Sequence, residues 1–313
     1  MRRHLLRLAP LVPCFAACFA LGGCFASRAI GRNLTASHEP RKVEHKIHEP
    51  RRADARLAVL WVGHATVLVQ MDDAFILTDP VFTNSVGEVS PRLVEPGLDA
   101  RDLPPLAAVV ISHMHFDHLS YDSLDMIQHK TKIALLPPGA RAIVPRYAFE
   151  TRELDRWESY DAGGVRITAV PVRHVGGRWG IDQAWRPRAF TGYVFEYHGL
   201  SVYFGGDTAF DRAHFEATRA RFPNLSLALL PICPTAPRDF MRRTHMDSIE
   251  ALDAFTLLGA ARMVPIHFDT FINSDDAPGD CPRFLRHHMR ERGLDDDRVS
   301  ILDIGEQRVF LTK

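Results

Sequence analysis

The stretch Val109–Leu119 limits the possible folds more than any other part of the chain. Its first four residues are apolar, β-branched or small, which is typical of the end of a buried strand. Four side chains that can bind metal follow within six positions, at His113, His115, Asp117 and His118. His113 and His115 share a face of extended backbone, whereas Asp117 and His118 follow in a turn. This spacing suits two neighbouring ions of zinc, iron or manganese, and the alternative is a solvated histidine-rich loop.

The H-x-H-x-D-H spacing of these residues resembles that of the metallo-β-lactamase fold. The resemblance implies an α+β protein, an αβ/βα four-layer sandwich, with three further ligands located after later strands. Suitable residues occur where they are needed. His174 follows the strand-like run Val165–Val170, Asp207 lies in a glycine turn after Tyr203-Phe204, and His267 ends the run that begins at Val264.

By this resemblance the ligands divide between two divalent ions, most simply Zn²⁺. One ion would be held by His113, His115 and His174, the other by Asp117, His118 and His267, and Asp207 would bridge them. Asp117 and Asp207 would also orient a metal-bridging hydroxide, the nucleophile that such a centre generates near neutral pH.

Three further residues are candidates for roles beside the ions. Asp79 resembles the acid that supports a ligating histidine in this fold. His64 lies in a Trp-x-Gly-His-Ala-Thr run, either beside the metal ligands or as an ordinary hydrogen-bonded structural histidine. His245 precedes a predicted helix that begins near Asp247, where anions are favoured. By the resemblance His245 would touch substrate or steer phosphate, and the alternative is a helix-capping role.

Several runs, which include positions other than the ligands, resemble one branch of this fold, the N-acyl-phosphatidylethanolamine phospholipase D family. They are Trp61–Thr66, Leu77–Phe82, Gly205–Thr208, Leu230–Ile232, Pro237-Arg238, Phe240-Met241, His245–Asp247 and Ile266–Phe268. The resemblance covers most of residues 55–270 and implies a zinc phosphodiesterase acting on membrane phospholipids. The alternatives are a lactonase or esterase of a soluble substrate, and a non-catalytic envelope lipoprotein.

The first 24 residues carry a targeting signal. Arg2, Arg3 and Arg7 precede the apolar run Leu8–Leu21, and Cys24 follows small residues as in a bacterial lipobox. The sequence therefore predicts a lipoprotein anchored through Cys24 in the outer membrane and facing the periplasm; the alternative is an ordinary signal peptide. Residues 25–54 are polar and predict a tether or an exposed early helix, and residues 55–313 form the predicted hydrolase domain.

Composition narrows the possible partners. Lys plus Arg equals Asp plus Glu, at 38 each, so the chain has no electrostatic footprint for nucleic acid. A phospholipid substrate and a membrane surface are the expected partners. The envelope permits disulfides, but Cys233 and Cys281 are expected to be two separately buried thiols, with pairing as the alternative.

Two segments give less definite expectations. Residues Gly176–Gly192 interleave arginines and aromatic residues, and Arg178 belongs either to a lid over the substrate or to a loop packed beneath the sheet. Near the C-terminus, strands are expected around Val299–Leu302 and Val309–Leu311, and a helix over Ala209–Ala220.

Overall fold

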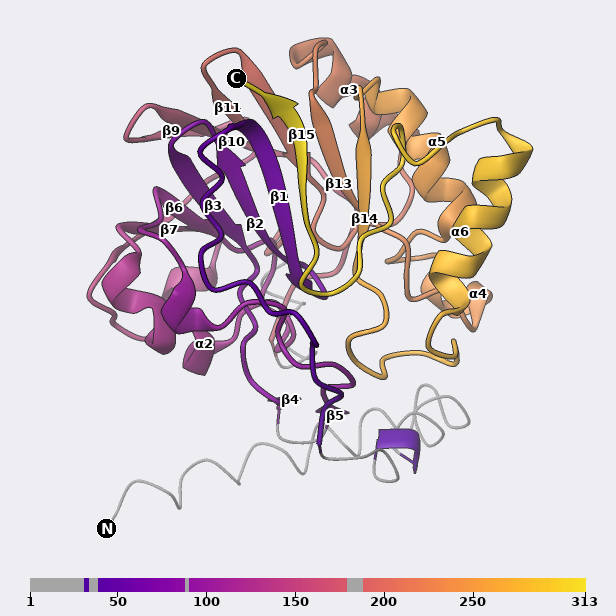
Figure 1. Ribbon diagram of the computed structural model, residues 1–313, viewed down its shortest axis with the longest axis horizontal. Coiled ribbons are helices and arrows are strands. Elements are labelled where there is room, and N and C mark those ends of the chain that lie inside the picture. The colour runs from indigo at the N-terminus through magenta and orange to yellow at the C-terminus, as the bar shows by residue number, and fades with distance from the viewer. Residues whose placement is uncertain (1–30, 34–38, 88–89, 179–187) are drawn as a thin grey trace.

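The computed structural model of the protein describes residues 31–33, 39–87, 90–178 and 188–313. Two β-sheets lie face to face, and helices cover their outer sides, so that the layers run helix, sheet, sheet, helix (Figure 1). The predicted α+β sandwich is confirmed.

The first sheet has seven strands, and the last strand of the chain lies beside the first (Figure 1). In spatial order they are β15 (Gln307–Thr312), β1 (Ala55–Gly63), β2 (Thr66–Met71), β3 (Ala74–Thr78), β6 (Ala108–Val110), β7 (Ile133–Leu136) and β8 (Glu150–Glu153). Strands β3, β6, β7 and β8 are parallel, so their carboxyl ends meet at one edge of the sheet. A separate short ribbon pairs β4 (Ser85–Val86) with β5 (Ser90–Pro91).

The second sheet has six strands. In spatial order they are β14 (Met263–Ile266), β13 (Leu227–Pro231), β12 (Leu200–Phe204), β11 (Gly192–Tyr197), β10 (Val165–Val170) and β9 (Ser159–Ala162). Strands β12, β13 and β14 are parallel, and β11 runs against both β10 and β12. Strands β10, β12, β13 and β14 therefore all point the same way, with their carboxyl ends together.

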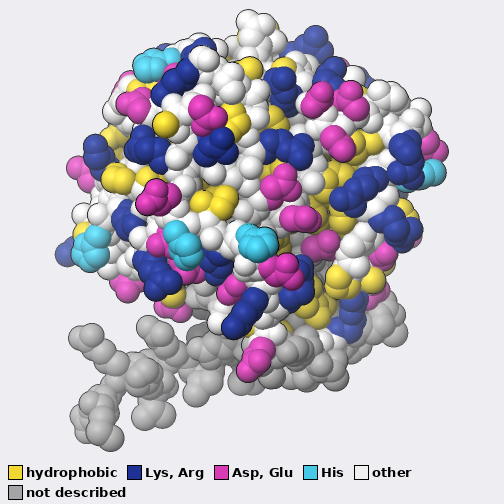
Figure 2. Space-filling model, in the orientation of Figure 1, with side chains coloured by type: hydrophobic (Ala, Val, Ile, Leu, Met, Phe, Trp, Pro, Cys, Tyr) yellow, Lys and Arg dark blue, Asp and Glu magenta, His cyan; other side chains and the backbone are white. Residues whose placement is uncertain are grey.

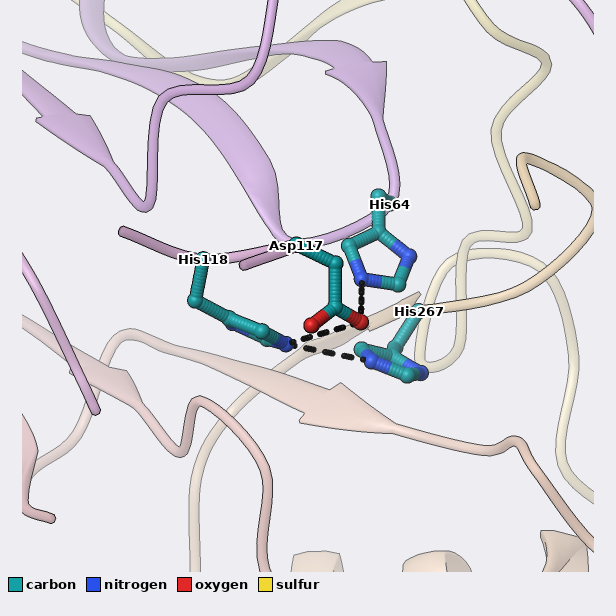
Figure 3. A group of neighbouring side chains, drawn as sticks. All are labelled: His64, Asp117, His118 and His267. Carbon is teal, nitrogen blue, oxygen red and sulfur yellow. Dashed lines mark hydrogen bonds and ion pairs between the residues drawn. The ribbon is translucent and has the colours of Figure 1, made fainter. Parts of the chain in front are cut away.

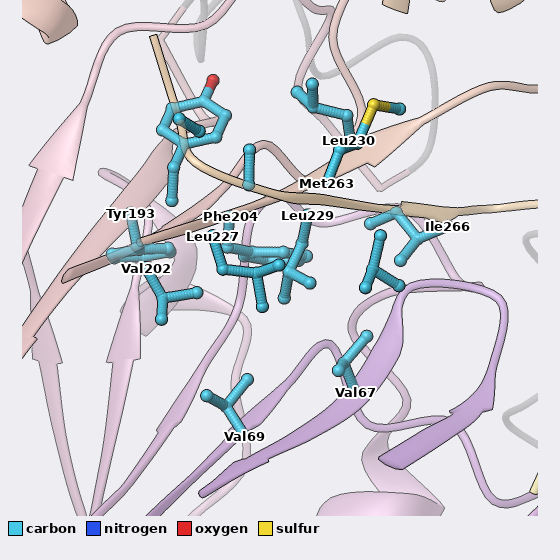
Figure 4. Packing of buried hydrophobic residues seen from close by; sticks show 14 of the residues in the cluster. Val67, Val69, Tyr193, Val202, Phe204, Leu227, Leu229, Leu230, Met263 and Ile266 are labelled. Atoms are coloured by element: carbon cyan, nitrogen blue, oxygen red, sulfur yellow. The ribbon is translucent and has the colours of Figure 1, made fainter. Parts of the chain in front are cut away.

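The main core lies between the two sheets. Along β2 successive side chains alternate in direction, so Val67 and Val69 point into this core whereas Leu68 points outward. Val67 and Val69 face Phe204 and Leu229 of the second sheet (Figure 4). Burying each such side chain contributes about 1.5–3 kcal/mol.

Helices cover both outer faces, and the side chains of Ser120, Asp211 and Asp247 cap α2, α3 and α5. Their bounds are α2 (Tyr121–Ile127), α3 (Arg212–Arg221), α4 (Arg238–Met241), α5 (Ser248–Leu258) and α6 (Asp280–Glu291), with 3-10 turns η1 (Ala100–Asp102), η2 (Gln128–Lys130) and η3 (Ala140–Ala142). The side chain of Asp211 accepts a hydrogen bond from the backbone of His214, so α3 begins later than the predicted Ala209.

The strand expected around Val299–Leu302 is wrong. This segment makes only an isolated bridge, between Val299 and Met263. Val299 and Leu302 are nevertheless buried in the core. Their apolar side chains are buried although the segment does not pair as a strand. The strand expected around Val309–Leu311 is confirmed as β15.

Cys233 and Cys281 form a disulfide, which corrects the expectation of two separate thiols. Their Cα atoms lie 6.1 Å apart across a sequence separation of 48 residues, within the range that a disulfide spans. The bond joins the loop after β13 to the first turn of α6.

The described part of the predicted tether runs along the domain. Lys46 forms ion pairs with Glu95 at 3.1 Å and with Asp99 at 2.9 Å, and Arg41 bridges to Val94. The predicted signal segment and Cys24 lie outside the described residues. Within the described ranges, the structure contains no helix that is both long and apolar enough to span a bilayer.

Candidate metal centre

The predicted ligands converge at the edge where the carboxyl ends of the strands meet. His113 follows β6, His174 follows β10, Asp207 follows β12 and His267 follows β14. The common direction of these strands explains how residues far apart in the sequence come together. The structure forms two groups of side chains there, with Asp207 between them.

The first group contains only imidazoles, from His113, His115 and His174. One ring nitrogen from each lies within 4.8 Å of the other two. His113 Nε2 faces His115 Nδ1 at 2.8 Å. His174 Nδ1 donates to the carbonyl of Thr244 at 2.9 Å, and its Nε2 has no hydrogen-bond partner among the described residues.

The second group combines three imidazoles with a carboxylate (Figure 3). It contains His64, Asp117, His118 and His267. His64 Nε2 lies 3.1 Å from Asp117 Oδ2, and His118 Nε2 lies 3.3 Å from His267 Nε2. Of the two alternatives for His64, the structure places it beside the ligands, among atoms close enough to share an ion with them.

Asp207 lies between the two groups. Its Oδ2 is 4.0 Å from His113 Nε2 and 3.4 Å from His118 Nε2, and its Oδ1 is 3.0 Å from His267 Nε2. Oδ2 also lies 3.9 Å from His174 Nε2. One buried carboxylate therefore reaches ligands of both groups, which is the geometry expected of a bridging residue.

Asp79 and Ser112 fix the orientation of two imidazoles. Asp79 Oδ2 accepts from His118 Nδ1 at 2.7 Å and from the Ser112 hydroxyl at 2.5 Å. Because that hydroxyl donates to Asp79, it accepts from His113 Nδ1 at 2.9 Å. His113 therefore keeps the lone pair of its Nε2, His174 does so through Thr244, and Asp79 fixes His118 with its Nε2 towards the site. Ser112 is a supporting residue that the sequence did not reveal.

These tautomers fit divalent cations. Neutral imidazoles that present Nε2 lone pairs, together with buried carboxylates, form the donor set typical of zinc and iron sites. The unpartnered Nε2 of His174 would be costly in a site without a cation, because a buried polar atom normally has a partner. The residues present thus fit two divalent ions.

The charges of the site also favour divalent cations. Burial lowers the pKa of His113 and of His174 well below the ordinary value, which keeps both rings neutral. Burial alone would raise the pKa of Asp207, but the imidazoles of His267 and His118 lower it well below its ordinary value. The pKa of His118 is raised because nearby carboxylates outweigh burial. The ionised carboxylates attract positive charge, either a proton on His118 or a cation held by the neutral rings of His113 and His174.

Unusual backbone conformations position several of these groups. His64 and His267 have φ angles of 56° and 66°, a region that non-glycine residues rarely adopt. The carbonyl of His64 accepts hydrogen bonds from Trp61 Nε1 at 3.0 Å and from the His267 backbone at 2.9 Å. Gly206 has a φ of 55°, and a Cβ there would lie 2.3 Å from Ser112 Cβ. Local strain at these turns is held by the surrounding structure, as is common at functional sites.

A cavity of about 300 Å³ opens over both groups. It is lined by His115, Asp117, His174, Asp207 and His267, and also by His245. His245 Nδ1 lies 3.6 Å from Asp207 Oδ2, and burial lowers the pKa of His245 to about 4. Asp247, whose side chain accepts from the backbone of Glu250 at 2.9 Å, caps α5. The helix-capping alternative for His245 is therefore wrong.

Arg178 packs against the loop that carries the candidate ligands from His113 to His118. Its guanidinium is buried between the rings of Phe116 and Tyr121, at 4.1 and 4.0 Å from their centroids. Nη1 donates to the carbonyls of Leu119 at 2.7 Å and Met114 at 3.3 Å. Arg178 is therefore part of a packed loop and not of a lid over the substrate. Residues 179–187 of the same segment lie outside the described residues.

Residues 75–268 match the Beta-lactamase superfamily domain, which is more than half of the chain. The chain belongs to this superfamily. Among solved structures, it is similar to the isothiocyanate hydrolase from Delia radicum gut bacteria, with a TM-score of 0.64 at 20% identity. That superposition covers 81% of this chain and 99% of the other and establishes the shared fold.

Two other proteins share a higher sequence identity with this chain than the isothiocyanate hydrolase does. An uncharacterized protein of Mycobacterium tuberculosis is 35% identical over 70% of this chain and 61% of its own length. The N-acyl-phosphatidylethanolamine-hydrolyzing phospholipase D 1 of Caenorhabditis elegans is 29% identical over 70% of this chain and 65% of its own. The chain thus spans less than two thirds of these relatives.

Proposed function

We propose that this superfamily member is a dinuclear-metal phosphodiesterase of the N-acyl-phosphatidylethanolamine phospholipase D type. Its substrate would be a membrane phospholipid, and its two ions would be zinc. Two observations support the branch: the runs of family-like residues, which extend beyond the ligands, and the similarity to the Caenorhabditis elegans phospholipase D.

Asp207 is the observation that carries the proposal. Its carboxylate reaches His113, His118, His174 and His267 within 4.0 Å, so two ions would share it. His113, His115 and His174 would hold one ion; Asp117, His118 and His267 the other, with His64 supporting Asp117. Ions bound there would lower the pKa of water and stabilise negative charge on a phosphate oxygen.

The chain's own groups would then orient and hold the reactants. Asp117 and Asp207 are ionised carboxylates that line the cavity, so they can accept hydrogen bonds from a nucleophilic water and orient it. His245 is neutral at pH 7 because burial lowers its pKa to about 4, so its imidazole offers one N–H to a phosphate oxygen. Phe240, Met241 and Pro234 line the same cavity and would contact apolar parts of the substrate.

We also propose that the protein is a lipoprotein of the bacterial envelope, anchored through Cys24 in the outer membrane and facing the periplasm. The lipobox-like run before Cys24 supports this placement. Acylation would provide membrane affinity without a spanning helix.

The proposal is tested by product analysis. The full chain, loaded with zinc, is incubated with vesicles containing N-acyl-phosphatidylethanolamine, and the products are identified by mass spectrometry. Release of N-acylethanolamine and phosphatidic acid is expected, and Asp207→Ala should abolish it. Hydrolysis of soluble lactones without any phosphodiester cleavage would contradict the proposal and favour the lactonase alternative.

A further inference from the structure

Apolar side chains stand on the rim of the metal-site cavity. The described residues include five large hydrophobic side chains that are clearly exposed, and two of them, Val175 at 36% and Phe240 at 54%, line this cavity. Phe240 belongs to α4 and Val175 follows His174. Large apolar side chains exposed at the mouth of a cavity commonly mark a contact surface.

Basic side chains adjoin this rim. Arg242 and Arg243 directly follow α4; both are exposed and neither forms an ion pair with a described residue. Asp239, in α4, is an acidic residue close to these arginines in the chain. Arg238 is paired with Asp247 and Glu250. The face drawn in Figure 2 carries Lys and Arg side chains interspersed with Asp, Glu and hydrophobic side chains. The rim therefore combines apolar contact with a small excess of positive charge.

The N-terminal segment approaches the same side. Arg32 donates to the carbonyls of Ser274 at 2.7 Å and Asp276 at 3.0 Å, and Asn33 donates to that of Ile272 at 3.0 Å. This loop contributes Asn273 to the cavity lining. Arg32 lies eight positions after Cys24, a span of at most about 28 Å when extended. A chain anchored at Cys24 would thus hold the cavity close to the bilayer.

From these observations we infer that the mouth of the cavity faces an anionic phospholipid bilayer. Phe240 and Val175 insert at the level of the headgroups, and Arg242 and Arg243 contact lipid phosphates. The inference rests on the proposed function and specifies the surface through which substrate enters. Aromatic and basic side chains are the combination that favours a membrane interface, and each arginine near an anionic surface strengthens binding about fivefold.

The orientation can be measured without relying on activity. The full chain is reconstituted into phosphatidylglycerol vesicles whose acyl chains carry bromine, which quenches tryptophan fluorescence. Phe240→Trp adds a reporter on the rim, and Asn224→Trp adds a matched exposed reporter in the turn before β13, at the opposite edge of the sheet. We expect the bilayer to quench the emission added at position 240 and not that added at position 224. Equal quenching, or the reverse, would overturn the inference.

Charge neutralisation tests the role of the two arginines. In the Phe240→Trp background, Arg242→Gln/Arg243→Gln should lower the ratio of quenched to unquenched chains about 30-fold on anionic vesicles. It should have no effect on neutral phosphatidylcholine vesicles. The matched control is Arg219→Gln/Arg221→Gln at the far end of α3, which should behave like the parent. An unchanged ratio for Arg242→Gln/Arg243→Gln would contradict the inferred lipid contact. Failure of the hydrolysis assay would contradict the proposed function and leave the quenching result standing.

Discussion

The two ligand groups share Asp207 but are built differently. In the first group all three members are imidazoles, and His174 is oriented by a backbone carbonyl, that of Thr244. In the second group Asp117 supplies a carboxylate, and His118 is oriented by the carboxylate of Asp79. A carboxylate partner makes an imidazole a stronger ligand than a carbonyl does, and an additional carboxylate ligand adds negative charge.

This difference indicates unequal affinities. The second group should hold its ion more tightly, and a chelator should remove the ion of the first group first. The four predictions below test this contrast from the largest expected effect to the smallest.

Asp207→Ala should weaken both groups. The side chain reaches ligands on each side, so its loss should lower hydrolysis by at least about 10²–10³-fold, the scale of removing one preorganised electrostatic group. Steady-state kinetics and metal analysis of the purified variant measure both effects. Asp207→Asn keeps the shape without the charge and serves as the control. Activity near the parent level in Asp207→Ala would contradict a shared carboxylate.

Arg178→Ala should affect both groups, because the loop that Arg178 contacts carries His113 and His115 of the first group and Asp117 and His118 of the second. It removes the buried guanidinium and its bonds to Leu119 and Met114, and should lower the free energy of unfolding by about 3 kcal/mol. Urea denaturation of the metal-free chain measures this loss separately from metal binding. Arg178→Lys keeps the charge but not the planar stacking, so its free energy of unfolding should lie between those of the parent and Arg178→Ala. A loss below about 1 kcal/mol would show that Arg178 does not hold the loop.

Asp79→Asn should act mainly on the second group. The change weakens the partner of His118 Nδ1 and should lower the affinity of that group for zinc by about 10–100-fold. Titration against a competing chelator resolves the two binding steps. An equal loss at both steps would remove the contrast between the groups.

Ser112→Ala should have the smallest effect. The hydroxyl connects Asp79 to His113 Nδ1, so the first group should lose a supporting hydrogen bond, a loss of about 0.5–1.5 kcal/mol. The same chelator titration should show a shift of a few-fold at the weaker step. A larger loss than in Asp79→Asn would reverse the expected order.

The convergence of the ligands could be predicted because each lies just after an apolar, β-branched run. His174, Asp207 and His267 follow β10, β12 and β14, whose shared direction brings them together. Their neighbours could not be inferred in this way. His64 lies on a turn between β1 and β2, and its ring packs 3.9 Å from that of His267 only because the two sheets are closed against each other.

Contacts between loops account for the other differences. The disulfide depends on how the loop after β13 meets α6, which the spacing of Cys233 and Cys281 does not encode. The sequence also could not show that Arg178 turns inward, because an arginine among aromatic residues suits a surface lid and a buried stack equally well. Val299 and Leu302 are apolar and buried, but their apolar character did not show that they are buried in a segment without a β-strand.

The most direct test of the central claim is the zinc content of the full chain. Elemental analysis after equilibrium dialysis against zinc should give two ions per chain for the parent. Stepwise chelation should remove them in two separate stages, and Asp207→Ala should bind less at both. A parent that binds a single ion, or an Asp207→Ala variant that keeps two ions with undiminished affinity, would contradict a dinuclear centre bridged by Asp207.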